Sequence, residues 1–546
     1  MGANKSIPDR NCLRRSRARG ARRARRVLSI VAFGIISLTA IGGQTTGSCT
    51  PAVVAAGKDE FLKSEWREAL KPLRTLPIQT EGFVRSAMTF SNQVMLAVRD
   101  DRSFRGQPSL VVVLWILADP EAARDTALLK VDHPDLVDLF GGKRISLVTY
   151  RDPHLFDRMR ELYASDQEQY LKPCNRLEGR AQRLEELPTD LAIVPRTDEW
   201  LSPAELGNAG PGGAADPLDV AILAQWESLS KALRGDDPEA GAKAASGLIE
   251  AVEAAADARG IETPHLRLDA LYQEHHPFAK SAFFYVFAAL FYGASLLFGP
   301  RWAARAGYAF LVVGFGEEVF GVVCRWILSG RAPLANMYES FTFATAGMVL
   351  VALVFEWTHK IRLAGLGGAV LGFIFMTLAH KAPIFDTKIA PLMPALQSSW
   401  LTYHVVTIML SYSAFALSFF VSVCYLGKDL LGGDASRIRL VRGLPSLPTL
   451  DVFNYKIIAV GFPLLTIGII LGAVWANTAW GRPWGFDPKE TWSAITWLVY
   501  ALYLHVRFLS GWRGRWAAVV ALLGFLCVLF TYLGVNYLLP GLHSYV

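Results

Sequence analysis

The sequence lacks Cys-x-x-Cys motifs and contains few charged residues. Its 546 residues include six cysteines, and no two of them form a Cys-x-x-Cys pair. That absence excludes a zinc knuckle, a thioredoxin-type redox site and the Cys-x-x-Cys-His attachment site of a c-type cytochrome. Charged residues make up only 19% of the chain, whereas apolar residues make up 52%. These proportions are typical of a membrane protein that also carries a soluble part.

The excess of positive charge is concentrated at the N-terminus. The formal net charge is +7, and residues 1–26 hold ten Lys or Arg and one acidic residue. They directly precede the apolar run Val27–Gly43. A basic flank before an apolar run is typical of a signal sequence or membrane anchor, and we assign residues 1–43 to such a segment. The charge therefore predicts no nucleic-acid partner.

Residues 44–280 carry charged side chains throughout and are expected to form a soluble domain, mixed α/β or α-rich. The apolar runs 110–117 and 145–150 predict buried strands or short helices. Residues 202–217 are rich in Gly and Pro and indicate a loop or linker, and the Ala-rich residues 218–258 predict one or two helices. This region contains no catalytic motif, so its function is not predicted.

Residues 281–546 are expected to form an eight-helix transmembrane block, which makes the chain a polytopic α-helical membrane protein. Each apolar run is close to the ~20 residues that cross a bilayer. With the N-terminal segment as a ninth span, twelve Lys or Arg fall on the cytoplasmic side of the block and five on the outer side, as the positive-inside rule requires. The expected spans are 281–299, 306–328, 340–357, 362–380, 400–427, 456–476, 490–508 and 516–537.

Tryptophan is unevenly distributed, and five of the 15 tryptophans fall within 23 residues. An aromatic belt at the membrane surface explains two or three of them, but not the Gly, Pro, Asp, Lys and Glu residues between them. Asp487 is expected to cap a helix that starts near Pro488, with Glu490 completing a capping box. We interpret the Trp-rich turn as a surface for a large, flat, apolar ligand. Its tryptophans are Trp475, Trp480, Trp484, Trp492 and Trp497.

The run Trp-Gly-x-x-Trp-Gly-Phe-Asp-Pro-Lys-Glu-Thr-Trp at 480–492 resembles the tryptophan-rich signature of the cytochrome c synthase family of the CcsA/ResC type. The resemblance covers about residues 281–546. It implies haem b as a transported substrate and thioether formation with an apocytochrome c that carries Cys-x-x-Cys-His. It also implies a membrane partner of the CcsB/ResB type and a thiol-reducing system. The expected location is the cytoplasmic (inner) membrane, with the soluble domain and the haem site on the extracytoplasmic face.

Two histidines are predicted to flank the Trp-rich turn on the outer side, His404 and His543. Two imidazoles can ligate haem iron from opposite sides, aromatic faces can pack the porphyrin, and Arg482 and Lys489 can meet its propionates. Either histidine alone would be read as an interfacial residue bonded to water or backbone. The pair around this turn favours ligation, and the resemblance implies the same two external ligands. His380 lies on the same side but lacks the matching flanks.

His505 is expected to lie near the cytoplasmic side, about 26 Å along the helix from Pro488 at ~1.5 Å per residue. The resemblance implies that it is a haem ligand within the membrane. The second ligand that would pair with His505 stays open, with His359 or a histidine of a partner subunit as alternatives.

Glu317 and Glu318 are adjacent carboxyls inside the second span, where relatives often carry His at the position of Glu318. Two interpretations are open for these carboxyls: one of them faces a water-filled vestibule and stays neutral, or one of them transfers protons or contacts haem.

Together these features predict a haem-handling subunit of a holocytochrome c synthase. It would take haem from the cytoplasmic side and present it outside, positioning the reactants without a covalent nucleophile. Two alternatives remain at this stage. One is a haem exporter or chaperone that does not attach haem, and the other is a non-catalytic membrane scaffold.

Overall fold

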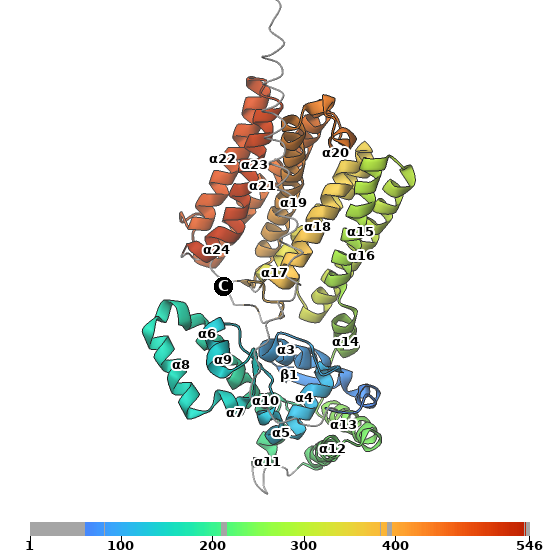
Figure 1. Cartoon of the computed structure of the whole chain (residues 1–546), viewed down its shortest axis with the longest axis vertical. Helices are drawn as coiled ribbons and strands as arrows, with labels where there is room; N and C mark the ends of the chain where they lie inside the picture. The colour runs from blue at the N-terminus through green and yellow to red at the C-terminus, as the bar shows by residue number, and fades with distance from the viewer. Residues whose placement is uncertain are drawn as a thin grey trace, which may run out of the picture.

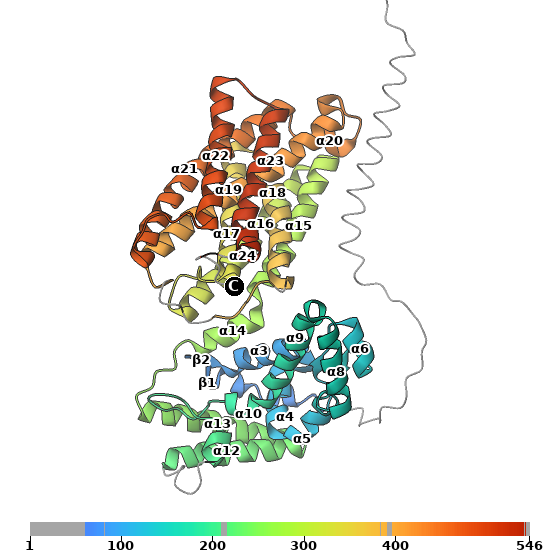
Figure 2. The same cartoon turned by 90° about the vertical axis from the view of Figure 1, so that its left-hand side faces the viewer.

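The computed structural model describes residues 61–80, 82–208, 216–382, 384–389, 392, 396–539 and 541. The expected signal or anchor at 27–43 and the predicted ligand His543 lie outside the described residues. Figure 1 shows two tiers, a block of long helices above and an N-terminal region of short helices and strands below. Figure 2 shows α14 (Leu266–His275) leading from the lower tier into the block.

The N-terminal region is mostly helical, with three short antiparallel hairpins formed by β1–β2, β3–β4 and β5–β6. The strands are β1 (Pro77–Thr80), β2 (Phe83–Ser86), β3 (Ser103–Phe104), β4 (Gln107–Pro108), β5 (Leu129–Lys130) and β6 (Arg144–Ile145). The helices before the linker are α2 (Trp66–Ala69), η1 (Pro72–Thr75), α3 (Ala87–Arg99), α4 (Ser109–Ala118), α5 (Pro120–Asp125), α6 (Pro134–Phe140), α7 (Leu147–Tyr150), α8 (Pro153–Ser165), α9 (Gln167–Glu185), α10 (Leu187–Asp190) and α11 (Pro203–Asn208). The Ala-rich stretch forms the two helices α12 (Pro217–Arg234) and α13 (Pro238–Ala258), in agreement with the sequence.

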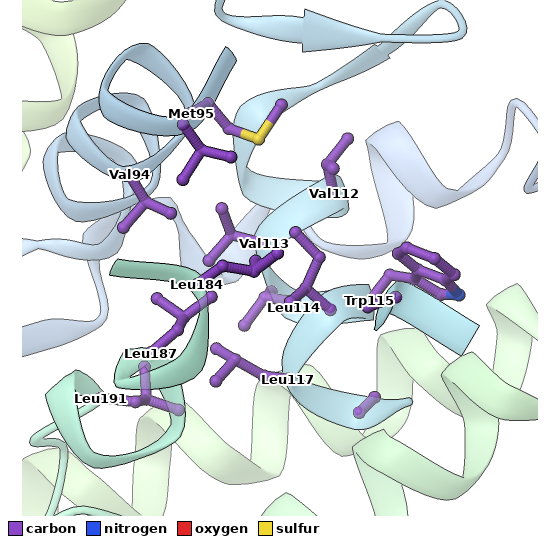
Figure 3. Close-up of a cluster of buried hydrophobic side chains, with 14 of the residues drawn as sticks. Val94, Met95, Val112, Val113, Leu114, Trp115, Leu117, Leu184, Leu187 and Leu191 are labelled. Carbon is purple, nitrogen blue, oxygen red and sulfur yellow. The ribbon is translucent and has the colours of Figure 1, made fainter. Parts of the chain in front are cut away.

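The apolar run at 110–117 forms the buried helix α4, so the helical alternative is the right one there. Every residue of α4 is buried, which explains why no amphipathic period marked it as a helix. Figure 3 shows its side chains, Val112 to Leu117, meeting Val94 and Met95 of α3 on one side and Leu184, Leu187 and Leu191 on the other. These contacts form the core of the N-terminal region.

The block contains eight long helical segments. They are α15 (Pro277–Phe298), α16 (Arg301–Ser329), α17 (Met337–His359), α18 (Arg362–Lys381), α19 (Ser399–Leu430), α21 (Leu447–Trp480), α22 (Pro488–Leu509) and the last segment, which runs through α23 (Arg515–Leu529), the π-helical turn η4 (Phe530–Gly534) and α24 (Val535–Leu538). The short elements η3 (Gly433–Ala435) and α20 (Arg439–Gly443) lie between α19 and α21.

Seven of these segments, with α14 and α15 counted as one, are long and apolar enough to cross a membrane within the described part of the chain. The protein is therefore an integral membrane protein with multiple spans. These seven candidates confirm part of the expected set of eight spans. The remaining expected span, at 490–508, forms α22, which is a helix of the right length but is less apolar than the other seven. Its Thr, Ser and Tyr residues, together with His505 and Arg507, lower its hydropathy.

Tight contacts at glycines hold α15 against its neighbours. The ring of Tyr285 lies 2.7 Å from where a Cβ on Gly314 of α16 would be, and the ring of Tyr292 takes the same place at Gly307. Tyr285 donates its hydroxyl hydrogen bond to Glu318, which is fully buried. Oε2 of its neighbour Glu317 lies 2.7 Å from Nε2 of His275. Both adjacent carboxyls thus have protein partners.

Candidate functional site

A cavity of about 200 Å³ opens where α17, α19, α21, α22 and the last helical segment meet. Figure 1 places α24, and with it this cavity, at the end of the block that faces the N-terminal region. The residues predicted from the sequence that line it are His404, Trp475, Trp484 and Lys489. Four of the predicted site residues therefore share one cavity wall.

His404 is held in a defined tautomer. Its Nδ1 lies 2.7 Å from the carbonyl oxygen of Gly468 on α21. Because a carbonyl only accepts hydrogen bonds, Nδ1 carries the proton, and in the neutral imidazole the lone pair resides on Nε2. A backbone carbonyl that fixes one ring nitrogen is the usual arrangement for a histidine that ligates metal through the other. The ring also lies parallel to Trp475, with centroids 6.4 Å apart and an interplanar angle of 6°.

Two glycines of α21 allow His404 to approach this closely. A Cβ on Gly472 would lie 2.7 Å from Cε1 of His404, and a Cβ on Gly468 would lie 2.6 Å from Ile408. Sequence reasoning missed both positions. Their spacing of four residues is the signal that could have found them, because small residues four apart let helices pack closely in membranes.

The five tryptophans of the Trp-rich turn take different places. Trp475 and Trp484 line the cavity, and Trp480 packs edge-on against Trp475 with centroids 4.8 Å apart. Trp492 packs on Phe530 at 4.1 Å. Trp497 donates from Nε1 to the hydroxyl of Thr466 at 2.9 Å, and neither residue lines the cavity. Two tryptophans thus face the cavity, and Trp492 and Trp497 join helices.

The turn before α22 has the predicted capping box, with Asp487 as N-cap and Pro488 at the first helical position. The Oε2 atom of Glu490 accepts hydrogen bonds from the backbone N–H groups of Gly485 at 2.7 Å and Asp487 at 3.1 Å. The Glu490 side chain also lines the cavity. One carboxylate therefore fixes the backbone of the turn and forms part of the cavity wall.

The cationic residues of the turn also differ in place. Lys489 donates from Nζ to Oδ1 of Asn536 at 2.9 Å, and both residues line the cavity. Arg482 is exposed, and its guanidinium lies over Gly485, where a Cβ would come within 2.5 Å of Cζ. Asn536 follows the π-helical turn η4 and was not predicted from the sequence. Lys489 alone of the two cations lines the cavity.

Gly541 lies against this turn. A Cβ on Gly541 would lie 2.7 Å from Oδ1 of Asp487, so Gly541 lies against the start of α22. His543 follows two residues later in the sequence. The other predicted ligand, His505, is exposed near the far end of α22 and does not line the cavity. His359 and His380 are also exposed and also lie apart from it.

The remaining cavity wall includes residues that were not among the predicted site residues. Asn336, Met337 and Ser340 belong to the start of α17, and Tyr412 belongs to α19. Tyr532 of η4 donates its hydroxyl hydrogen bond to the carbonyl of Met337 at 3.0 Å. Within the residues that the structure describes, no group of three or more His, Cys, Asp or Glu is arranged to hold a metal ion. Among the described histidines, His404 is the one that lines the cavity.

The chain is similar to known proteins over its C-terminal half. The family model described as cytochrome C assembly protein matches residues 334–543. The cytochrome c biogenesis protein CcsA of Guillardia theta is 42% identical over 256 residues, which are 43% of this chain and 85% of that protein. CcsA of Porphyra purpurea is 38% identical over 296 residues (47% and 92%), and CcsA of Microcystis aeruginosa is 39% identical over 268 residues (40% and 81%). Through this half, which carries the cavity and the Trp-rich turn, the chain belongs to the cytochrome c assembly protein family, with a CcsA-type role in cytochrome c biogenesis.

Proposed function

We propose that this protein binds haem in the cavity beneath the Trp-rich turn and presents it for covalent attachment to an apocytochrome c. The observation that carries the proposal is the state of His404, whose Nδ1 proton is committed to the Gly468 carbonyl. The Nε2 lone pair of such an imidazole suits a haem iron. Trp475 and Trp484 supply aromatic walls, and Lys489 supplies a cation for a propionate.

The second axial ligand in this proposal is His543. The support is the position of Gly541 beside Asp487, because a segment of two residues reaches at most about 7 Å from there. His505 keeps the role of a ligand within the membrane, on the path of haem towards the cavity. Since His505 is exposed on α22, a partner of the CcsB/ResB type would supply its second ligand.

The attachment reaction needs positioning more than it needs reactive side chains. A client thiol adds across a haem vinyl group, with sulfur bonding to the carbon beside the ring and hydrogen going to the outer carbon. No electrons are gained or lost overall, so the contribution of this chain is to hold haem where two thiols of Cys-x-x-Cys-His can reach it. The thiols must be reduced, which calls for a thiol-reducing system.

The location of the cavity sets where the client would meet haem. The cavity lies at the end of the block that faces the N-terminal region. We place both on the extracytoplasmic face of the cytoplasmic membrane, because the distribution of Lys and Arg over the loops favours that orientation. Residues 44–280 then form an extracytoplasmic domain directly beside the haem site.

The absorption spectrum of the protein purified from haem-replete cells tests the proposal. We expect bound haem in the parent, and we expect His404→Ala to lose most of it. His154→Ala is the matched control, since His154 is an exposed histidine on α8 that does not line the cavity. A colourless parent, or equal haem in the His404→Ala variant, would contradict haem binding at this site and would favour a scaffold.

Co-expression with an apocytochrome c separates attachment from transport. A haem exporter or chaperone would use the same cavity without making a thioether. We expect covalently attached haem on the client when this chain and its partner are present, and a loss of that product when this chain is omitted. If the client carries as much covalently attached haem without this chain as with it, the chain does not take part in attachment, and only the transport function remains.

A further inference from the structure

The N-terminal region touches the membrane block through a buried arginine. Arg85 of β2 is only 5% exposed, and it donates from Nη1 to the carbonyl of Leu328, in the last turn of α16, at 3.2 Å. The next residue, Ser86, donates from its backbone N–H at 2.9 Å and from its hydroxyl at 2.7 Å to Asp269 of α14. The Arg85 side chain therefore joins β2 to α16, and α14 holds the residue that follows it.

The end of α16 carries a second buried arginine that binds α17 and the segment between α18 and α19. Arg325 pairs with Glu339 of α17 at 2.9 Å and donates to the carbonyls of Thr387 at 2.9 Å and Lys388 at 3.3 Å. Burial lowers the pKa of the Arg85 guanidinium, and the positive charges of Arg325 and Arg331 lower it further against the opposing effect of Asp269. The three guanidinium groups thus lie within electrostatic range of one another at one junction.

Glu339 connects this junction to the cavity wall. Its carboxylate accepts from Arg331 at 3.0 Å and from the backbone N–H of Ala335 at 3.0 Å, while its own N–H donates to Oδ1 of Asn336 at 2.8 Å. Asn336 in turn donates to the carbonyl of Lys388 at 3.1 Å. Ala335 and Asn336 line the cavity, so the buried ion network ends at its wall.

We propose that Arg85 is a positioning residue for the haem cavity, acting through α16 and the Arg325–Glu339–Arg331 network on the wall formed by Ala335 and Asn336. The N-terminal region then has a role in haem binding in addition to any role in receiving the client. This inference rests on the proposed function, because the wall that Arg85 positions is the wall of the proposed haem cavity. Breaking a contact in such a packed network changes a distant equilibrium by a modest amount.

The test compares two arginines at the same junction. Arg74 of η1 pairs with Glu274 of α14 at 2.7 Å and is not among the residues that line the cavity, so Arg74→Met is the matched control. We expect Arg85→Met to weaken haem binding by roughly three- to tenfold and to shift the haem absorption maximum and reduction potential. Arg74→Met should leave all three unchanged.

A combined variant checks that the effect passes through the wall. If Arg85 acts through Asn336, haem binding in Arg85→Met/Asn336→Ala should be no weaker than in the more affected single variant, because coupled residues are not additive. Arg85→Lys keeps the positive charge and a hydrogen-bond donor, so its haem binding should fall between that of the parent and that of Arg85→Met. It replaces Arg85→Met in the test if that variant does not accumulate.

Three outcomes would overturn the inference: haem properties of Arg85→Met or Arg85→Lys equal to those of the parent, the same change in Arg74→Met, or full additivity with Asn336→Ala. Each leaves haem binding by the parent intact and so leaves the proposed function standing. A parent that binds no haem is a separate result, which removes the proposed function and this inference with it.

Discussion

Gly472 leaves the space that the imidazole of His404 occupies. A Cβ at position 472 would lie 2.7 Å from Cε1 and 2.8 Å from Nδ1 of that ring. The same helix, α21, thus accepts the hydrogen bond of His404 at Gly468 and makes room for the ring at Gly472, one turn later. The orientation of His404, the proposed ligand, therefore depends on the absence of a Cβ atom at Gly472.

Gly472→Ala should displace His404 and lower haem content. The added methyl group overlaps the ring, and overpacking of this kind costs about 1–3 kcal/mol unless the ring moves away from Gly468. Gly293→Ala on α15 is the control, because a Cβ there meets nothing within 4 Å. The haem absorption spectra of the two purified variants give the comparison. Parental haem content and an unchanged spectrum in Gly472→Ala would show that the position of His404 does not matter.

Trp484→Ala and Trp492→Ala should change different properties, the first haem affinity and the second stability. Trp484 lines the cavity, so its loss should lower haem affinity with little change in thermal stability. Trp492 packs on Phe530, so its truncation should lower stability by up to about 3 kcal/mol and affect haem only as folding is lost. Haem titration and thermal unfolding in detergent measure the two effects separately. Identical behaviour of the two variants would refute this division of roles.

Glu490→Ala should loosen the Trp-rich turn. It removes the acceptor of the Gly485 and Asp487 N–H groups, and leaving such donors unsatisfied costs about 1–3 kcal/mol. Faster hydrogen exchange of these two amides should accompany weaker haem binding. Glu490→Gln keeps a side-chain oxygen acceptor and should retain most of the protection. If both variants exchange at the parental rate, the capping box does not stabilise the turn.

Labelling from outside the cell should reach the turn and not the opposite end of the block. Phe486 is 82% exposed in the turn, and Leu430 is 69% exposed at the end of α19. In a variant without the native cysteines, Phe486→Cys should react with a membrane-impermeant maleimide in intact spheroplasts. Leu430→Cys should react only after the membrane is opened. The reverse pattern would invert the proposed orientation and move the haem site to the cytoplasmic side.

The sequence predicted those features that depend on local chemistry. The capping box at Asp487 and Glu490 follows from residue types at fixed spacing, and the start of α22 at Pro488 agrees with it. The span expected at 340–357 is a helix from Met337 to His359, because apolar length alone marks it. The span expected at 490–508 is a helix too, but its polar residues keep α22 out of the set that length and apolarity define.

The division of labour among the tryptophans could not be predicted, because it depends on neighbouring helices. Trp492 and Trp497 are five residues apart, which turns them about 140° from each other on a helix. One meets Phe530 of the last segment, and the other meets Thr466 of α21. Likewise, nothing near Arg85 in the sequence points to Leu328, which is 243 positions away.

The π-helical turn at Phe530–Gly534 has a consequence for the C-terminal end of the chain. Thr531 and Asn536 both line the cavity although they are five residues apart, a spacing that a regular α-helix would turn by about 140°. A π turn brings residues at this spacing towards the same face. Removing a single residue here would restore an ordinary helix and rotate everything beyond it, so that Asn536 would lose Lys489 and Gly541 would lose its place against Asp487.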